Sequence, residues 1–99
     1  MIRHTVVFRL KHPDGSEAER DFLSAAQQQL APIPGVESFE RLRQVSRKNQ
    51  FRFGFSMEFA DQRAYDAYSN HPAHNRFVQE RWIPEVDEFL EIDYTPYQS

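Results

Sequence analysis

The chain has 99 residues, a length that fits a single domain spanning residues 1–99. Its formal net charge of −3 at pH 7 argues against nucleic-acid binding, which requires a basic surface. The absence of cysteine excludes disulfides, thiolate metal sites and a cysteine nucleophile, and fits a reducing compartment. No apolar run approaches the roughly 20 residues of a membrane-spanning helix, and we expect no signal peptide. These features predict a soluble, cytoplasmic protein with neither nucleic acid nor membrane as a partner.

The first third of the chain carries a strand pattern followed by a helix pattern. Residues 2–11 alternate apolar and polar side chains, with β-branched residues among them, which predicts a strand. Residues 12–15 are typical of a turn, and Ser16 precedes Glu19 by the three residues of a capping box. The helix expected after Ser16 has an apolar face and ends in the proline-rich segment 32–35.

The middle of the chain predicts two strands and a second helix. Residues 36–46 form a weaker strand pattern, in which irregular apolar spacing indicates a β-bulge. Residues 51–59 contain the clearest strand, with phenylalanine and methionine alternating with small or polar residues. Asp61 is a suitable cap for a helix at about residues 62–69.

The last third predicts a further helix and a final strand. A helix is expected over about residues 72–82, because its first residue is proline, which suits a first helical turn. Pro84 should interrupt that helix, Val86 and Phe89 should continue a final turn, and residues 90–95 should form the last strand. The resulting order, β-α-β-β-α-β, predicts a ferredoxin-like α+β fold with a four-stranded antiparallel sheet and helices on one face.

Two of the four histidines are easily placed from their neighbours in the sequence. His12 lies in the predicted turn and should be at the surface. His4 shares a strand face with apolar residues such as Val6 and Phe8, and should therefore point under the helices. Two interpretations of His4 remain open: a hydrogen-bonded core histidine, and an imidazole that lines a cavity.

Tyr65, Tyr68, His71 and His74 recur every three residues, so a continuous helical path would place them along one side. The tyrosines could simply pack with their hydroxyls at the rim, and His71 could simply be the residue that starts a helix before proline. An H-x-x-H pair with His4 as a third ligand could bind a metal, but no acidic residue follows at the spacing of metal proteases. We therefore predict no metal.

Cofactor-free chemistry is the alternative use of these side chains. A buried neutral imidazole is a good general base near pH 7. A tyrosine hydroxyl beside it can donate a hydrogen bond to a developing enolate. The three glycines are isolated, so no glycine-rich phosphate loop is present. Such a pair could abstract a proton next to a carbonyl group, with no cofactor.

Several segments together resemble a known family. They are His4 in the first strand, residues 33–36 after the first helix, the segment Tyr68-Ser69-Asn70-His71-Pro72-Ala73-His74, Phe77, and the ending from Phe89 to Pro96. In combination they resemble the stress-responsive A/B barrel (Dabb) family of the dimeric α/β-barrel superfamily. The resemblance covers nearly the whole chain. It implies a homodimer in which two sheets face each other as a barrel, with the helices outside.

The resemblance also implies roles for individual residues. Polyketide cyclases of this family in plants perform an aldol cyclisation with a histidine base and a nearby tyrosine. By similarity, His74 would be the base, Tyr68 its hydrogen-bonding partner, and His4 an orienting histidine in the same cavity. If Arg76 reaches the pocket mouth, the substrate would be shorter or anionic. Further ligand contacts are expected from His71, Tyr65, Phe22, Phe77, Arg76 and Trp82.

Three functional hypotheses follow. The first is a cofactor-independent cyclase- or lyase-like enzyme acting on a small carbonyl compound. The second is a non-catalytic dimer that binds a small molecule or serves in a stress response. The third is a cofactor-free monooxygenase acting on electron-rich aromatic compounds, with Trp82 and the histidine pair lining its site.

Overall fold

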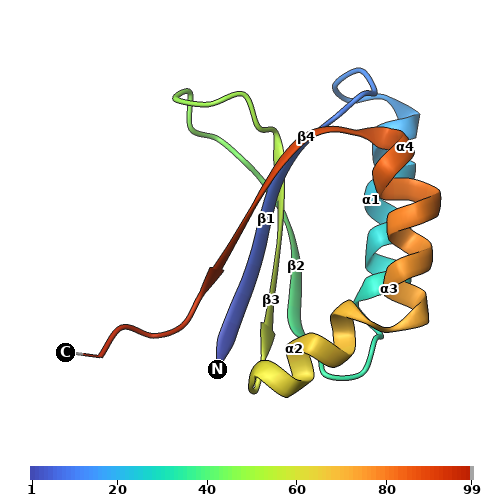
Figure 1. Cartoon of the computed structure of the whole chain (residues 1–99). Helices are drawn as coiled ribbons and strands as arrows, with labels where there is room; N and C mark the ends of the chain where they lie inside the picture. Colours follow the sequence, from blue (N-terminus) through green and yellow to red (C-terminus); the bar gives the residue numbers. More distant parts are fainter. Residues whose placement is uncertain (99) are drawn as a thin grey trace.

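The computed structural model describes residues 1–98 and confirms the predicted ferredoxin-like α+β fold. A four-stranded antiparallel sheet has the strand order β2-β3-β1-β4. All the helices lie on one face of this sheet (Figure 1). In chain order the elements are β1 (Ile2–Leu10), α1 (Glu17–Leu30), β2 (Glu37–Arg43), β3 (Phe53–Phe59), α2 (Gln62–Ser69), α3 (Pro72–Phe77), the π-helix η1 (Val78–Trp82), α4 (Ile83–Glu85) and β4 (Val86–Tyr94).

The helix starts follow the capping signals in the sequence. The Ser16 hydroxyl accepts a hydrogen bond from the Glu19 backbone N–H at 3.2 Å, and α1 begins directly after it. The Glu19 carboxylate accepts from the backbone N–H of Gly15 at 2.9 Å, one residue earlier than in a standard capping box. Asp61 caps α2 in the same way, because its carboxylate accepts from the Ala64 N–H at 2.9 Å. These side chains satisfy backbone donors that have no partner inside the helix.

The predicted bulge in the second strand is present. The register of β2 against β3 shifts between Glu37 and Glu40. Ser38, inside this shift, has φ of 53°, a left-handed conformation that a non-glycine residue seldom adopts.

The segment that follows α4 differs from the sequence-based expectation. Val86 and Phe89 do not continue a helical turn, because β4 begins at Val86 and pairs with β1, placing Phe89 opposite Phe8. The backbone N–H of Lys11 donates to the Glu85 carbonyl at 2.8 Å, which extends the pairing to the helix end. Pairing with β1 gives alternate residues of β4 backbone hydrogen bonds and buries Val86, so a strand is favoured over a further helical turn.

The hydrophobic core lies between the sheet and the helices. Phe8 of β1 and Phe22 of α1 are fully buried, with ring centroids 5.8 Å apart. The ring of Phe77 in α3 lies 5.5 Å from that of Phe22, between centroids, so one aromatic cluster joins the sheet to α1 and α3. Complete burial of such a side chain contributes roughly 1.5–3 kcal/mol to stability. None of the helices within residues 1–98 is long and apolar enough to cross a membrane.

No helix covers the other face of the sheet (Figure 1). The cross-strand pairs Val7–Leu90 and Thr5–Ile92 place two large apolar side chains of β4 on this open face. Leu90 and Ile92 remain 50% and 39% exposed. The β4 side of the open face is therefore apolar, and ion pairs such as Arg3–Glu58 lie toward the ends of the face.

Candidate functional site

A cavity of about 330 Å³ lies between the sheet and the helical arm of α3, η1 and α4. Most of its walls are apolar, from residues such as Met57 and Trp82. Its ionisable lining residues, within the described part of the chain, are His4, Tyr68, His74 and Glu91. This volume is near the lower end of the range for ligand sites and fits a small molecule.

His4 on the strand wall is fixed by a carboxylate. It is 8% exposed, and its Nδ1 lies 2.6 Å from Oδ1 of Asp93, which is directly opposite on β4. An ionised carboxylate can only accept hydrogen bonds, so Nδ1 carries a hydrogen and donates it to Asp93. The other ring nitrogen, Nε2, has no hydrogen-bond partner among residues 1–98. The geometry therefore leaves Nε2 free to interact with a ligand in the cavity.

Tyr65 holds this pair together from behind. Its hydroxyl donates to Oδ2 of Asp93 at 2.7 Å and lies 2.9 Å from Nδ1 of His4. Its ring stacks on Phe59 with centroids 5.1 Å apart and an interplanar angle of 4°. Burial, followed by the hydrogen bond to Asp93, raises the pKa of Tyr65 above its ordinary value. Tyr65 therefore stays a neutral donor that orients Asp93.

Tyr68 and His74 form the helical wall. Their ring centroids are 4.6 Å apart, and Tyr68 lies 6.2 Å from the ring of His4. Tyr68 is 2% exposed, and burial raises the pKa of its hydroxyl, which keeps it protonated as a hydrogen-bond donor. Burial lowers the pKa of His74 below its ordinary value, although hydrogen bonds to Asn75 and to the Ser69 backbone act in the opposite direction. Neutral pH thus leaves His74 uncharged and able to accept a proton.

A π-helical turn shapes the same wall. In η1 the backbone N–H of Ile83 donates to the carbonyl of Val78, five residues earlier. Val78, Trp82 and Ile83 all line the cavity. π-Helical turns are rare in proteins overall, and those that occur are often found at functional sites. Here the turn lies directly before Pro84, which cannot donate a helical hydrogen bond of its own.

Four of the six further residues expected to contact a ligand do not line this cavity: Tyr65, which lies behind His4, and the three residues His71, Arg76 and Phe22. Nδ1 of His71 accepts from the Ala73 backbone N–H at 3.0 Å, so His71 caps α3. His71 and Arg76 line a separate depression beside the loop that follows α1. Phe22 is fully buried in the core. The lining of the cavity therefore does not support the ligand contacts that were expected from His71, Arg76 and Phe22.

The remaining expected residues are close to one another. Phe77 and Trp82 line the cavity with His4, Tyr68 and His74. Tyr65 lies behind His4 and not in the lining. No group of three His, Asp or Glu side chains within residues 1–98 is arranged to hold a metal ion.

Sequence reasoning missed the two carboxylates, Glu91 and Asp93. Both belong to β4, and the register pairs them with Val6 and His4 on the helix-covered face. The signal was the alternation in β4, where acidic residues at 91 and 93 separate apolar residues at 90, 92 and 94. Once His4 is assigned to the inner face, its partner on β4 must face inward too.

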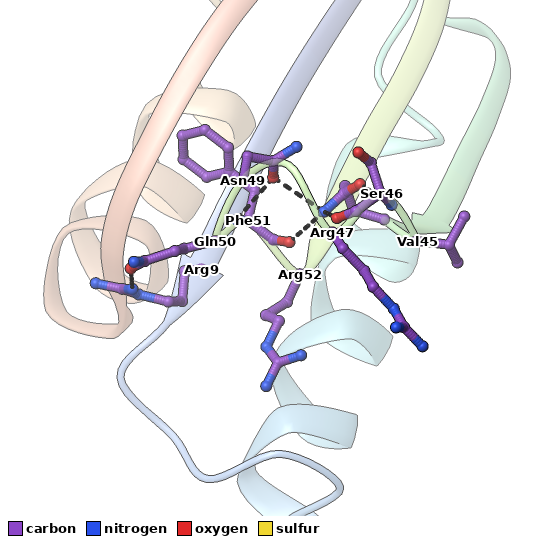
Figure 2. A pocket seen from close by; sticks show the side chains of 9 residues that line it. Arg9, Val45, Ser46, Arg47, Asn49, Gln50, Phe51 and Arg52 are labelled. Carbon is purple, nitrogen blue, oxygen red and sulfur yellow. Dashed lines mark hydrogen bonds between the residues drawn. The ribbon is translucent and has the colours of Figure 1, made fainter.

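A larger depression of about 680 Å³ lies at the loop between β2 and β3 (Figure 2). Two of the arginines that line it, Arg9 and Arg52, already form ion pairs with carboxylates. Arg9 donates to Asp87 at 2.6 Å and to Gln50 at 2.7 Å, and Arg52 pairs with Asp14. The loop itself is stabilised by the Gln44 side-chain amide, which donates to Asn49 Oδ1 at 2.9 Å. The smaller cavity, which His4, Tyr68 and His74 line, is therefore the better candidate site.

The family model described as Stress responsive A/B Barrel Domain, Dabb, matches residues 2–96. The chain belongs to the Dabb family. A Dabb family protein with a ferredoxin-like fold from Mesorhizobium loti is 58% identical, with a TM-score of 0.97, and the match covers 98% of this chain and 97% of that one. None of the curated proteins matches the chain.

Two more distant structures share the fold of this Dabb chain. A hydroxynitrile lyase from Passiflora edulis is 14% identical with a TM-score of 0.84, over 99% of this chain and 94% of that one. A dimeric ferredoxin-like protein of unknown function from Thermobifida fusca is 17% identical with a TM-score of 0.79, over 96% of this chain and 90% of that one. At such identities the likeness concerns the fold alone.

Proposed function

We propose that this Dabb protein is a cofactor-independent enzyme that moves a proton at a carbon next to a carbonyl group of a small molecule. The observation that supports this proposal is the cavity in which a neutral His74, the Tyr68 hydroxyl and the Asp93-bound His4 surround one space. A base, a hydrogen-bond donor and an oriented imidazole are the groups that such a reaction needs.

The proposed reaction begins with His74 as the general base. His74 removes the proton from the α-carbon, and the electron pair of the C–H bond moves into the carbonyl system as an enolate. Tyr68, kept protonated by its raised pKa, donates a hydrogen bond to the oxygen where negative charge develops. His4 orients the substrate through Nε2, because Asp93 fixes its other nitrogen. The enolate can then attack a second carbonyl group or expel a leaving group, giving cyclase- or lyase-like products.

The fold is compatible with this chemistry without selecting it. The hydroxynitrile lyase from Passiflora edulis shows that a chain of this architecture can be a lyase. No comparable observation favours the monooxygenase hypothesis, in which Trp82 would line a site for aromatic substrates.

The test is deuterium exchange at the α-carbon of small ketones in D2O, followed by proton NMR. The wild type should accelerate exchange, and His74→Ala should slow it by about 10²–10⁴-fold, the usual contribution of a general base. Tyr68→Phe, which keeps the ring, should cost about 10²–10³-fold. His12→Ala is the matched control, since His12 lies outside the cavity and pairs with Glu85. A loss of less than tenfold in His74→Ala would exclude His74 as the base, and binding without exchange would favour a non-catalytic small-molecule-binding dimer.

We further propose that the protein is a homodimer that pairs the open faces of two sheets. The support is the apolar β4 side of that face, with Leu90 and Ile92 exposed and the ion pair Arg3–Glu58 toward one end. The dimeric protein from Thermobifida fusca has the same fold. Sedimentation should give twice the chain mass for the wild type, and Leu90→Lys should shift it to the monomer, because dimerisation would bury an unpaired charge. A monomeric wild type at micromolar concentration would contradict this proposal.

A further inference from the structure

The cavity carries one acidic side chain that is not used in the proposed proton transfer. Glu91 lies on β4 opposite Val6, and its side chain lines the cavity from the sheet side. In the part of the chain described, the Glu91 carboxylate makes no hydrogen bond or ion pair with another side chain, in contrast to Asp93 on the same strand face. A carboxylate without a protein partner can accept hydrogen bonds only from solvent or from a ligand.

The surroundings of Glu91 contain no compensating positive charge. No lysine or arginine lines the cavity within residues 1–98. Arg76, the arginine nearest in sequence to the histidine pair, lines the separate depression beside His71. The ionisable groups that face Glu91 are His4, His74 and Tyr68, and burial favours the neutral forms of Tyr68 and His74. The polar side of the cavity is therefore electronegative.

Two aromatic side chains line the same cavity. Trp82 of η1 and Phe89 of β4 have ring centroids 5.5 Å apart in an edge-to-face arrangement. Phe89 is 52% exposed, lies two residues from Glu91 and shares its strand face. Aromatic faces attract cations, even at partly exposed sites. A cavity lined by a carboxylate and aromatic rings is suited to an ammonium group.

We infer that the substrate is a small carbonyl compound that carries an ammonium group. The ammonium would pair with Glu91 against Trp82 and Phe89, and the carbonyl would lie between Tyr68 and the histidines. This inference rests on the proposed function and adds the charge of its substrate. It differs from an anionic substrate selected by Arg76, because Arg76 does not line the cavity while Glu91 does. An anion would be repelled by the Glu91 carboxylate, and a neutral alcohol would gain only a hydrogen bond from it.

The alternative explanation is that Glu91 is a solvated residue of an edge strand. Glu91 is exposed, and β4 is at the edge of the sheet. A solvated carboxylate would interact equally weakly with ligands of either charge. The two explanations therefore predict different ligand selectivity.

The test uses three ligands that share a ring and a ketone: 4-aminocyclohexanone, 4-hydroxycyclohexanone and 4-oxocyclohexanecarboxylate. Their dissociation constants are measured on the whole protein by NMR titration, following the histidine rings and the indole of Trp82. The amine should bind at least tenfold more tightly than the alcohol, and the carboxylate should bind most weakly. Glu91→Gln should reduce the preference for the amine to less than threefold while changing the affinity for the alcohol by less than twofold.

Glu88→Gln is the matched control, because Glu88 lies on the same strand but on the open face, opposite Arg9. It should leave the preference for the amine unchanged. Equal binding of the three ligands, no binding of any of them, or a preference that survives Glu91→Gln would each overturn the inference. Failure of the inference is separable from failure of the proposed function. Deuterium exchange of a neutral ketone by the wild type, without any preference for the amine, would support the proton-transfer proposal alone, and preference for the amine without any exchange would support the binding inference alone.

Discussion

The two faces of the sheet are built from the same strands but have opposite chemistry. On β1 and β4, the pairs His4–Asp93 and Phe8–Phe89 face the helices, while Val7–Leu90 faces away. The covered face combines fully buried aromatic rings with a cavity lined by two histidines, Tyr68 and Glu91. The open face has exposed aliphatic side chains on its edge strand β4. Because successive side chains of a strand point to opposite faces, neighbouring residues of one strand belong to the proposed site and to the proposed partner surface.

The comparison teaches that acidic residues on a strand do not always mark the solvent side. In β4 the carboxylates of Glu91 and Asp93 face the helices, and Leu90 and Ile92 face outward. Glu91 lines the cavity and Asp93 binds His4, whereas the outward aliphatic side chains are left without cover in one chain. The following four predictions test how far the two faces differ.

The largest expected effect is on the packing of the covered face. Phe22→Ala should lower the free energy of unfolding by about 3–5 kcal/mol, because Phe22 is fully buried against Phe8 and Phe77 and its removal leaves a void. Urea unfolding at fixed protein concentration measures the change. Ile92→Ala on the open face is the control and should cost less than Phe22→Ala. Similar losses for the two variants would mean that the open face is packed as tightly as the core.

The second prediction concerns the strand wall of the cavity. Asp93→Asn should reduce the rate of α-proton exchange about 10–100-fold, about 1.4–2.7 kcal/mol in the barrier, because the amide no longer imposes the Nδ1-protonated form of His4. Tyr65→Phe should cost less, since the direct contact between Asp93 and His4 remains. Asp87→Asn, which alters the ion pair with Arg9 outside the cavity, should leave the rate within about twofold. An unchanged rate in Asp93→Asn would show that His4 needs no fixed tautomer.

The third prediction is a pH dependence that originates at His74. Burial lowers the pKa of His74 in the folded protein from the ordinary 6.5, so the unfolded chain binds more protons over the interval between the two values. His74 therefore makes the free energy of unfolding rise with pH across that interval, and the stability is lost as pH falls from about 6.5 through the lower folded value. The difference between wild-type and His74→Gln unfolding curves, measured from pH 4 to 8, should show this slope. A difference that stays flat over the whole range would mean that His74 is solvated in both states.

The smallest expected effect is on the rim of the open face. Arg3 lies 3.8 Å from Glu58, and the side chain of Arg3 is 51% exposed. Such a pair typically contributes about 0.2–1 kcal/mol, so Arg3→Ala should change the free energy of unfolding by no more than that. Thermal unfolding at two protein concentrations measures it. A larger loss that grows with protein concentration would show that the rim is buried against a second copy of the chain.

The sequence alone determined the order and type of the main elements and several of their ends. Strict alternation in residues 51–59, and capping side chains at Ser16 and Asp61, are local signals, and the chain obeys them because they satisfy backbone groups within a few residues. The inward direction of His4 also followed from alternation along β1. The start of β4 at Val86 did not follow from the sequence pattern, because a helical turn and a strand compete at this point. The partner strand that decides between them lies more than seventy residues earlier in the chain.

Only the tertiary structure decided which side chains meet. It brought Asp93 and Tyr65 to His4 across 89 and 61 residues of sequence, which no local pattern encodes. It assigned His71 to the cap of α3 and Phe22 to the core, and it placed Arg76 outside the cavity that Glu91 lines. Local spacing fixes the side of an element on which a residue lies. The register between strands and the packing of helices over the sheet fix what that residue touches.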